Sequence, residues 1–529
     1  MRGIAAAIRD GRTSLGIELG SSRIKACLVG DDPSMVLAVG EHEWENQLID
    51  DRWSYSLESV WAGVQSAFAA VIVDAERRHG ERPTSFGAIG ISAMMHGYLA
   101  FDDSGELLVP FRTWRNTNTG PAATELTTAF GVNIPLRWSI AHLYQAVLDH
   151  EPHVGEINFV TTLAGYVHWK LTGQRVLGIG DASGMFPIDT ATHDYDARLV
   201  TRFASLVAES APALHVGVLL PRVLLAGQPA GELTPEGAAL LDPTGSLRTG
   251  ILFCPPEGDA GTGMVATNSA APRAGNVSAG TSIFAMVVLE RPLERVHEEL
   301  DVVTTPAGDP VAMVHCNNGA SELAAWVAIF RRFAEAAGSP LSQDDAYSAL
   351  FREALDGQAD AGGVLAYNQL AGEPIAGLAA GRPLIVRTND SHFTLANLMR
   401  AQLYGVFATL SLGMGVLGDE GVELDRMFAH GGIFRTAHVA QRFLAAALRA
   451  PVSIAETASE GGAWGIAVLA AFAASGATDS LAGYLHSQVF RGASFTVVEP
   501  HPDDVDGFAA YLTLYRAGLA IERIASNTI

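Results

Sequence analysis

Hydrophobic and polar positions follow two rhythms along the chain, one typical of strands and the other typical of helices. Apolar runs at residues 15–19 and 24–29 flank a Gly-Ser-Ser turn, which predicts a β-hairpin. Apolar residues at helical spacing predict helices over residues 56–78, 321–337 and 395–413. Because strand and helix patterns alternate throughout, the sequence indicates α/β domains. Residues 157–172 are also predicted as a helix that ends at Gly173, and strands are predicted over residues 86–92, 98–101 and 251–254.

The hairpin pattern occurs twice. Residues 276–289 again place an apolar run, a Gly-Thr-Ser turn and a second apolar run in succession, about half a chain after the first copy. Two such tips, each with small residues and backbone N–H groups, can close on a polyphosphate from opposite sides. The pattern therefore predicts a duplicated half, with chance similarity of two short hairpins as the alternative.

Composition limits the function classes. The chain has 529 residues, of which 48% are hydrophobic and 17% charged, so two or three domains with real cores are expected. Its net charge of −23 and the lack of a basic run argue against nucleic-acid partners and anionic membranes. Three widely spaced cysteines favour a reducing cytoplasm over a disulfide framework. The apolar patch near the N-terminus is too short for a signal peptide, and the alanine-rich run over residues 463–474 falls well short of a bilayer span, so a soluble, cytosolic protein is expected.

A carboxylate follows the strand predicted over residues 251–254. Asp259 lies between Gly258 and Gly261, where a helix is predicted to begin. A helix-capping role is common for such an aspartate. The same position suits a general base, because phosphoryl transfer to an alcohol needs a carboxylate that accepts the hydroxyl proton. The two roles are compatible.

Residues 93–119 form the densest polar and aromatic segment. His96 follows an apolar run that ends at Met95, and a single histidine in this setting is more often a core residue than a ligand. Hydrogen-bonding groups beside an aromatic ring suit a polyhydroxylated small substrate. The loop that supplies them contains Trp114, Arg115, Asn116 and Asn118.

Two glycine-rich turns precede predicted helices near the C-terminus. They contain Gly431 with Gly432, and Gly461 with Gly462. Glycine lets a backbone and a nucleotide base approach closely, so the pair could bracket an adenosine; tight helix packing is the alternative. Neither a Walker A motif nor a spaced Rossmann fingerprint is present.

Taken in order, these segments resemble those of the FGGY carbohydrate kinases, within the sugar kinase, actin and Hsp70 superfamily. The resemblance runs from Leu15 to about Ala474. It rests on IELGSSRIKA, IGISAMMHG, FRTWRNTNT, VHWKLTG with GDASGMFPID, EGDAGTG, NVSAGTS, and HGG with EGGAWGIA.

The resemblance implies an α/β protein with two RNase H-like domains around a central cleft, over residues 1–268 and 269–529. It implies ATP and Mg²⁺ as cofactors, Asp259 as the catalytic base that also contacts the sugar, and Glu18 as a magnesium residue acting through water. Sugar contacts are expected from Met95, His96, Trp114 and Arg115. ATP contacts are expected from Gly20, Ser21, Ser22, Lys25, Gly280, Thr281, Ser282, Gly431, Gly432, Gly461 and Gly462.

Three departures from the family pattern bear on the substrate. Glu18 stands where aspartate is usual, Ala260 replaces an asparagine that touches sugar, and residues 140–145 replace a Pro-Lys-x-x-Trp segment. Similarity to ribulokinase-like members that share SAMMHGYLAF and EGDAGTGM favours L-ribulose over D-xylulose as the acceptor. Alternatives are another ketose or polyol, or an ATPase or ATP-binding regulator on the same fold. A homodimer is a further arrangement to test.

Overall fold

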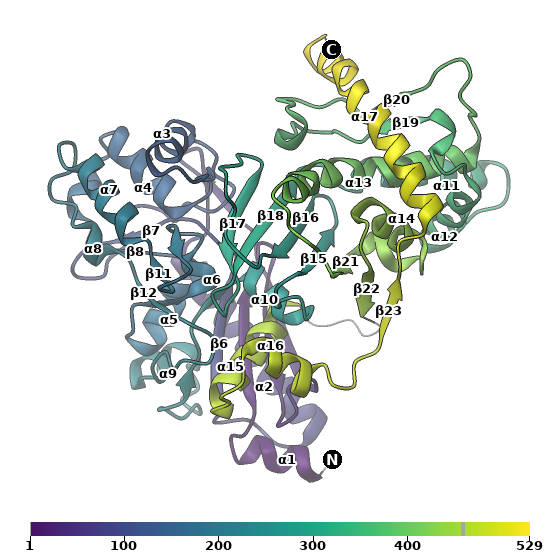
Figure 1. The fold of residues 1–529 in the computed structure, drawn as a ribbon. Helices are drawn as coiled ribbons and strands as arrows, with labels where there is room; N and C mark the ends of the chain where they lie inside the picture. The colour runs from purple at the N-terminus through teal and green to yellow at the C-terminus, as the bar shows by residue number, and fades with distance from the viewer. Residues whose placement is uncertain (1, 456–460, 529) are drawn as a thin grey trace. The chain divides into compact units, whose positions relative to one another are not determined.

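The structure is a computed structural model that describes residues 2–455 and 461–528. The chain forms two compact units (Figure 1). The first comprises residues 1–270, 302–311 and 458–493, and the second comprises residues 271–301, 312–457 and 494–529. The two-range division inferred from the sequence, 1–268 and 269–529, stays a prediction about domains.

The first unit is built on a sheet opened by the predicted hairpin. Strands β1 and β2 pair antiparallel, with Leu19 opposite Ile24, while β6 adds in parallel on the other side of β1. The strand order is β13-β6-β1-β2-β3, and β14 also pairs with β6. The strands are β1 (Ser14–Leu19), β2 (Arg23–Val29), β3 (Val36–Glu43), β6 (Ala88–Ala93), β13 (Leu252–Phe253) and β14 (Glu257–Gly258).

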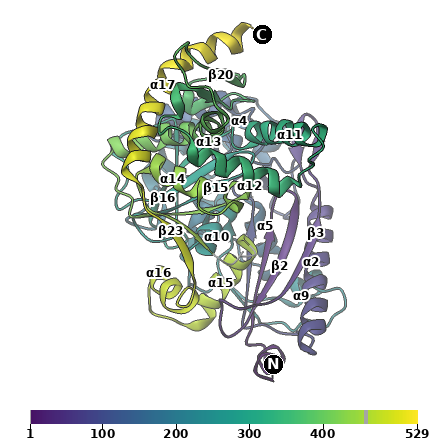
Figure 2. The same cartoon turned by 90° about the vertical axis from the view of Figure 1, so that its right-hand side faces the viewer.

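Successive side chains of β1 point to opposite faces of the sheet, and a different helix packs on each face. Helix α2 (Leu57–His79) packs on β2 and β3, where its Gly63 lies against Ile24, which is on the Leu19 face (Figure 2). Helix α15 (Gly462–Ser475) packs on the opposite face, which carries Gly16 and Glu18. A Cβ at Gly16 would lie 2.2 Å from the Ala463 carbonyl oxygen, so only glycine permits this close approach.

The predicted helix over residues 157–172 is wrong in its first half. Strand β8 (Phe159–Thr161) comes first and pairs with β7 (Leu99–Phe101), and α5 (Leu163–Thr172) follows. The Thr162 hydroxyl accepts the Gly165 N–H and caps the helix, which ends at Gly173 as predicted. The other α-helices described in this unit are α1 (Arg2–Arg9), α3 (Gly120–Phe130), α4 (Ser139–Leu148), α6 (Ile179–Ala182), α7 (Ala197–Val207), α8 (Val216–Leu219), α9 (Pro235–Leu241), α10 (Asp259–Ala266) and α16 (Leu481–Tyr484).

The second unit repeats the hairpin, as the sequence predicts. β15 and β16 pair antiparallel through the Gly-Thr-Ser turn, and β21 adds to β15 in parallel. The sheet has the order β17-β18-β16-β15-β21-β22-β23. Its strands are β15 (Ala274–Ala279), β16 (Ile283–Val288), β17 (Leu300–Thr304), β18 (Pro310–Cys316), β21 (Arg426–His430), β22 (Val452–Ala455) and β23 (Phe495–Val498).

One long buried helix, α13 (Leu395–Asp419), organises the packing of the second unit. It contacts α14 (Val439–Leu448), α12 (Gln343–Glu353) and α17 (Pro502–Thr528), and α11 (Ser321–Ala336) contacts α12 beside it (Figure 1). The predicted helices over residues 321–337 and 395–413 are both confirmed, the second running six residues further.

Two of the described helices, α2 and α13, have the length and apolar composition that a bilayer span needs. Each packs its apolar side chains against a sheet or neighbouring helices, and α13 is buried over most of its length. Burial within a protein core accounts for their composition.

Candidate active site

Asp259 is the first residue of α10, directly after strand β14. The sequence allowed a capping role for it, but the cap position belongs to Gly258. Asp259 Oδ1 accepts a hydrogen bond from the Met95 N–H at 3.0 Å, which ties α10 to the end of β6. Asp259 is exposed, although protein surrounds its carboxylate closely. The resulting desolvation raises the pKa of the carboxyl, while the hydrogen bond from the Met95 N–H lowers it.

Two further carboxyl groups are buried beside the β14–α10 connection. Glu257 accepts the N–H groups of Gly180 at 3.3 Å and Asp181 at 2.9 Å. Asp181 Oδ2 accepts the Thr162 hydroxyl at 2.6 Å. Burial raises the pKa of both acids, and each carboxyl is also affected by a neighbouring one. Neither residue was predicted as a site residue, although Asp181 lies in GDASGMFPID and Glu257 in EGDAGTG.

Glu18 lies on the α15 face of β1. Its Oε2 accepts the Ala463 N–H at 3.1 Å, and a Cβ at Gly462 would lie 2.0 Å from Oε1. Burial, then the charge of Asp259, raises the pKa of Glu18 to about 7, while Lys25 on the neighbouring strand lowers it. Two mutually repelling carboxylates fit a cation near them. Among the described residues no three His, Cys, Asp or Glu side chains form a ready-made metal cage.

The carbonyl oxygens of the first hairpin tip accept hydrogen bonds from neighbouring parts of the protein. Trp44 Nε1 donates to the Gly20 oxygen at 2.7 Å, and the Tyr55 hydroxyl donates to the Ser21 oxygen at 2.6 Å. The Trp44 N–H donates to the Ser22 oxygen at 3.2 Å. Free carbonyl oxygens would repel a phosphate. Because these three accept hydrogen bonds from the protein, the exposed tip is suited to bind an anion.

His96 is buried and holds a left-handed backbone conformation with φ of 71°. Its Nδ1 lies 3.2 Å from the Gly184 oxygen. A carbonyl only accepts, so Nδ1 carries the proton and Nε2 is left as an acceptor. Burial lowers the pKa of His96 to about 3, so the ring is neutral. It stacks on Trp138, with 6.4 Å between ring centroids, a neighbour that no sequence motif indicated.

The predicted sugar loop lies next to the first hairpin tip. Trp114 is exposed, and its Nε1 donates to the Ser21 hydroxyl at 3.3 Å. The Arg115 guanidinium lies 4.4 Å from the centroid of the Trp53 ring. Asn116 holds the loop to Trp53 through both the backbone N–H and the carbonyl of that residue.

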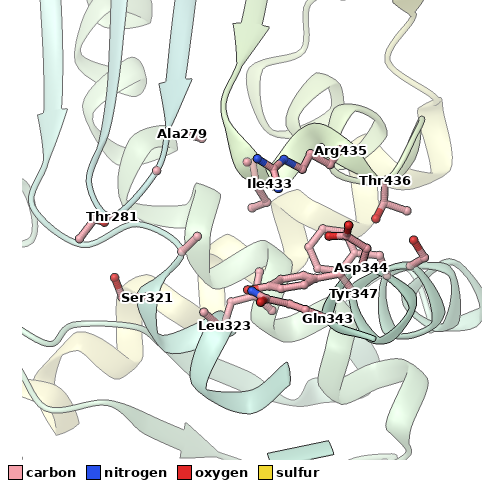
Figure 3. Close-up of a pocket in the computed structure, with 16 residues that line it drawn as sticks. Ala279, Thr281, Ser321, Leu323, Gln343, Asp344, Tyr347, Ile433, Arg435 and Thr436 are labelled. Atoms are coloured by element: carbon pink, nitrogen blue, oxygen red, sulfur yellow. The ribbon is translucent and has the colours of Figure 1, made fainter. Parts of the chain in front are cut away.

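The second unit contains a pocket of about 510 Å³ beside its hairpin tip (Figure 3). Gly280, Thr281 and Gly432, all predicted ATP residues, line it. The side chains of Asp344 and Tyr347 lie opposite the turn that carries Ile433 and Arg435. No pattern in the sequence indicated that residues of helix α12 would line this pocket. The other lining residues are Ala279, Ala320, Ser321, Leu323, Ala324, Gln343, Ser348, Phe351 and Thr436.

The remaining glycines fall in different units. Gly431 directly follows β21 and lies against Ala279. Ser282 is the last residue of the turn before the return strand β16 of the second hairpin. Gly461 and Gly462 begin α15 in the first unit, and the preceding residues 459 and 460 of the predicted turn lie outside the described residues.

Comparison with known proteins agrees with this arrangement. Residues 13–245 match the N-terminal domain, and residues 275–474 the C-terminal domain, of the FGGY family of carbohydrate kinases. Xylulose kinase of Haemophilus influenzae is 22% identical over 434 residues, which cover 79% of this chain and 82% of that protein.

Solved structures show the same fold. The crystal structure of xylulose kinase from Rhodospirillum rubrum aligns with a TM-score of 0.78 at 22% identity, over 96% of this chain and 99% of that one. Gluconate kinase from Lactobacillus acidophilus aligns with a TM-score of 0.78 at 16% identity, over 97% and 100%.

The duplicated hairpin sheets and these alignments define the two-domain kinase fold of the sugar kinase, actin and Hsp70 superfamily. The chain belongs to the FGGY family of carbohydrate kinases.

Proposed function

We propose that this carbohydrate kinase transfers the γ-phosphoryl group of ATP to a terminal hydroxyl of a ketopentose. The observation that carries the proposal is the placement of Asp259. It is an accessible carboxylate in dense protein, and the amide of Met95, next to His96, holds it in place.

Asp259 acts as the general base. The sugar hydroxyl oxygen attacks the γ-phosphorus, its proton passes to Asp259, and the bond from the γ-phosphorus to the bridging oxygen breaks to release ADP. A base works best when its pKa approaches the working pH, and burial raises the pKa of Asp259 in that direction.

Glu18 would hold magnesium, acting through water, and the ion would neutralise charge on the phosphate groups. The Ala463 N–H fixes one oxygen of Glu18, so the carboxylate keeps one orientation at the end of β1. Lys25, on the facing strand, adds positive charge near the same hairpin.

The nucleotide occupies the pocket of the second unit. Thr281 and the start of α11 offer small residues and backbone N–H groups to phosphate oxygens, whereas the Gly280 N–H donates to the Ser282 oxygen at 2.9 Å within the turn. Leu323, Tyr347 and Phe351 supply apolar surface for the base. Gly20 to Ser22, Ser282, Gly431, Gly461 and Gly462 remain further proposed nucleotide contacts.

His96 forms a hydrogen bond with the sugar. Its Nε2 is an unprotonated acceptor, so it takes a hydrogen bond from a substrate hydroxyl. Met95, Trp114 and Arg115 complete the proposed sugar contacts. Motif similarity favours L-ribulose, whereas the curated relative from Haemophilus influenzae supports D-xylulose.

A coupled assay of ADP release tests the proposal with L-ribulose, D-xylulose, glycerol and gluconate as acceptors. A ketopentose should give the highest kcat/KM. If glycerol or gluconate exceeds both ketopentoses, the substrate assignment is wrong while the kinase assignment stands. ADP release that is equally fast without any acceptor would instead favour the ATPase alternative.

A further inference from the structure

A buried polar network lies behind the nucleotide pocket of the second unit. Asn318, in the connection from β18 to α11, and Glu373 are both buried. The Asn318 N–H and Nδ2 donate to Glu373 Oε2 at 3.2 and 3.0 Å. Asn318 Oδ1 accepts the N–H groups of Leu370 at 2.8 Å and Ala371 at 2.9 Å. Asn318 thus joins two loops by these four hydrogen bonds, three of which its side chain makes.

The network continues into the hairpin tip. The Gly319 N–H donates to the Thr281 oxygen at 2.7 Å, and the Ala320 N–H donates to the Gly280 oxygen at 2.9 Å. A Cβ at Gly319 would lie 2.4 Å from the Gly280 oxygen, so the two backbones touch. The residues immediately after Asn318 therefore fix the tip that lines the pocket.

Asn368 also holds the connection between β18 and α11 in place. Its Nδ2 donates to the carbonyl oxygens of Asn318 at 3.2 Å and Gly319 at 2.8 Å. Buried polar groups rigidify a site when most of their hydrogen bonds are made. The Gly280 and Thr281 carbonyls are occupied on the protein side, while both residues stay exposed at the pocket.

We propose that Asn318 and Glu373 are positioning residues for the nucleotide, holding the Gly280–Thr281 tip and the start of α11 at the spacing that binds phosphate oxygens. The proposal rests on the proposed function, because it assumes that this pocket takes the nucleotide. Neither side chain is among the pocket's lining residues, so each acts through the backbone of the tip.

The geometry of Glu373 predicts which substitution is tolerated. Oε2 accepts both donors of Asn318, whereas Oε1 is buried and has no hydrogen-bond partner in the described part of the chain. Burial raises the pKa of Glu373 to about 7, consistent with a carboxyl that has no cation beside it. Glutamine can keep its oxygen at the Oε2 position and place its amide nitrogen at Oε1. Alanine loses both hydrogen bonds.

The test compares Asn318→Ala, Glu373→Ala and Glu373→Gln with the exposed control Asn389→Ala. Binding of MgADP and MgATP is measured by calorimetry without any acceptor, and steady-state kinetics give the two KM values. Loss of a buried hydrogen-bond pair should weaken nucleotide affinity about tenfold or more in both alanine variants. The sugar KM should stay within about twofold of the wild-type value. Glu373→Gln and Asn389→Ala should bind as the wild type does.

Asn317→Ala serves as a milder variant if Asn318→Ala does not fold. Asn317 is exposed and donates to the Gly372 oxygen at 2.8 Å, so its loss should weaken nucleotide binding less. Unchanged nucleotide affinity in the folded variants, or an equal loss for the sugar, overturns the proposal. Failure of Glu373→Gln to behave as the wild type also overturns it. Wild-type protein that binds nucleotide but phosphorylates no sugar contradicts the proposed function alone.

Discussion

Asp259 is exposed at the start of α10, where the Met95 N–H holds one of its carboxylate oxygens. Its side chain meets solvent, yet the protein around it is dense enough to raise its pKa. A carboxylate of this kind attracts protons more strongly than an ordinary surface aspartate and remains reachable by a substrate.

Asp259→Asn should therefore remove proton acceptance while keeping the shape of the site. We expect kcat to fall by about 10²–10⁴-fold, the usual contribution of a positioned general base. Nucleotide affinity, measured by calorimetry, should change little. Asp103→Asn, at an exposed position of the same unit, is the matched control and should keep full activity. Sugar phosphorylation at the wild-type rate in the Asp259 variant would exclude it as the base.

Residues were predictable from the sequence where their partners are close along the chain. A strand followed by Gly-Asp and a helix start is a local pattern, and it led to Asp259. Glu257 was missed because the amides that it binds come from a segment 77 residues earlier. His96 was found, but its stacking partner Trp138 depends on a tertiary approach that no local pattern contains.

At the scale of elements, both hairpins were predictable because an apolar run, a small turn and a second apolar run need only nearest-neighbour pairing. The error over residues 157–172 has the opposite cause. The short strand β8 exists through its pairing with β7, about sixty residues earlier, and this tertiary pairing overrides the local helical pattern.

The contact between α15 and β1 gives an element-scale prediction. Gly462→Ala places a Cβ where Glu18 Oε1 and Thr262 Oγ1 now lie, at 2.0 and 2.8 Å. Either the helix start or the Glu18 carboxylate must move. We expect a lower Tm and a higher magnesium concentration for half-maximal rate, because Glu18 is the proposed magnesium residue.

Gly263→Ala is the control for this change. Gly263 lies within α10, and a Cβ there meets no atom within 4 Å. Alanine favours the helix by up to about 1 kcal/mol relative to glycine, so this variant should be as stable as the wild type or more stable. If Gly462→Ala kept the wild-type Tm and magnesium requirement, the close packing at Glu18 would be wrong.

At the scale of the whole molecule, two features could not be predicted from the sequence. Residues 302–311 and 458–493 return to the first unit, where α15 packs on β1, β2, β6 and α10, elements that come far earlier in the chain. Residues of α12 and of the second hairpin tip line the same proposed nucleotide pocket, although about sixty residues separate them in the sequence. Long-range packing of this kind leaves no local signal. The predicted cytoplasmic location, the homodimer and the absence of nucleic-acid and membrane partners stay predictions.

The buried titratable groups also set how the stability of the whole molecule depends on pH. Burial lowers the pKa of His96 and His142 to about 3, so below about pH 6.5 the unfolded chain binds more protons there and stability rises with pH. Above pH 6.5 these histidines are neutral in both states and contribute no slope. Burial raises the pKa of Glu257 to about 8, and that of Asp181 rises for the same reason.

Together with Glu18 and Glu373, whose pKa values burial raises to about 7, these two acids set the slope above pH 6.5. Between the ordinary carboxyl pKa near 4 and about 8, the folded state holds protons that the unfolded chain has lost, so stability falls as pH rises. Each such proton is worth about 1.4 kcal/mol per pH unit. We expect the Tm, measured without nucleotide or metal, to fall from pH 6.5 to pH 8. Glu257→Gln should make that fall shallower, because glutamine has no proton to lose. A Tm that is level or rises over this range in the wild type would mean that Glu257 and Asp181 are already ionised in the folded protein.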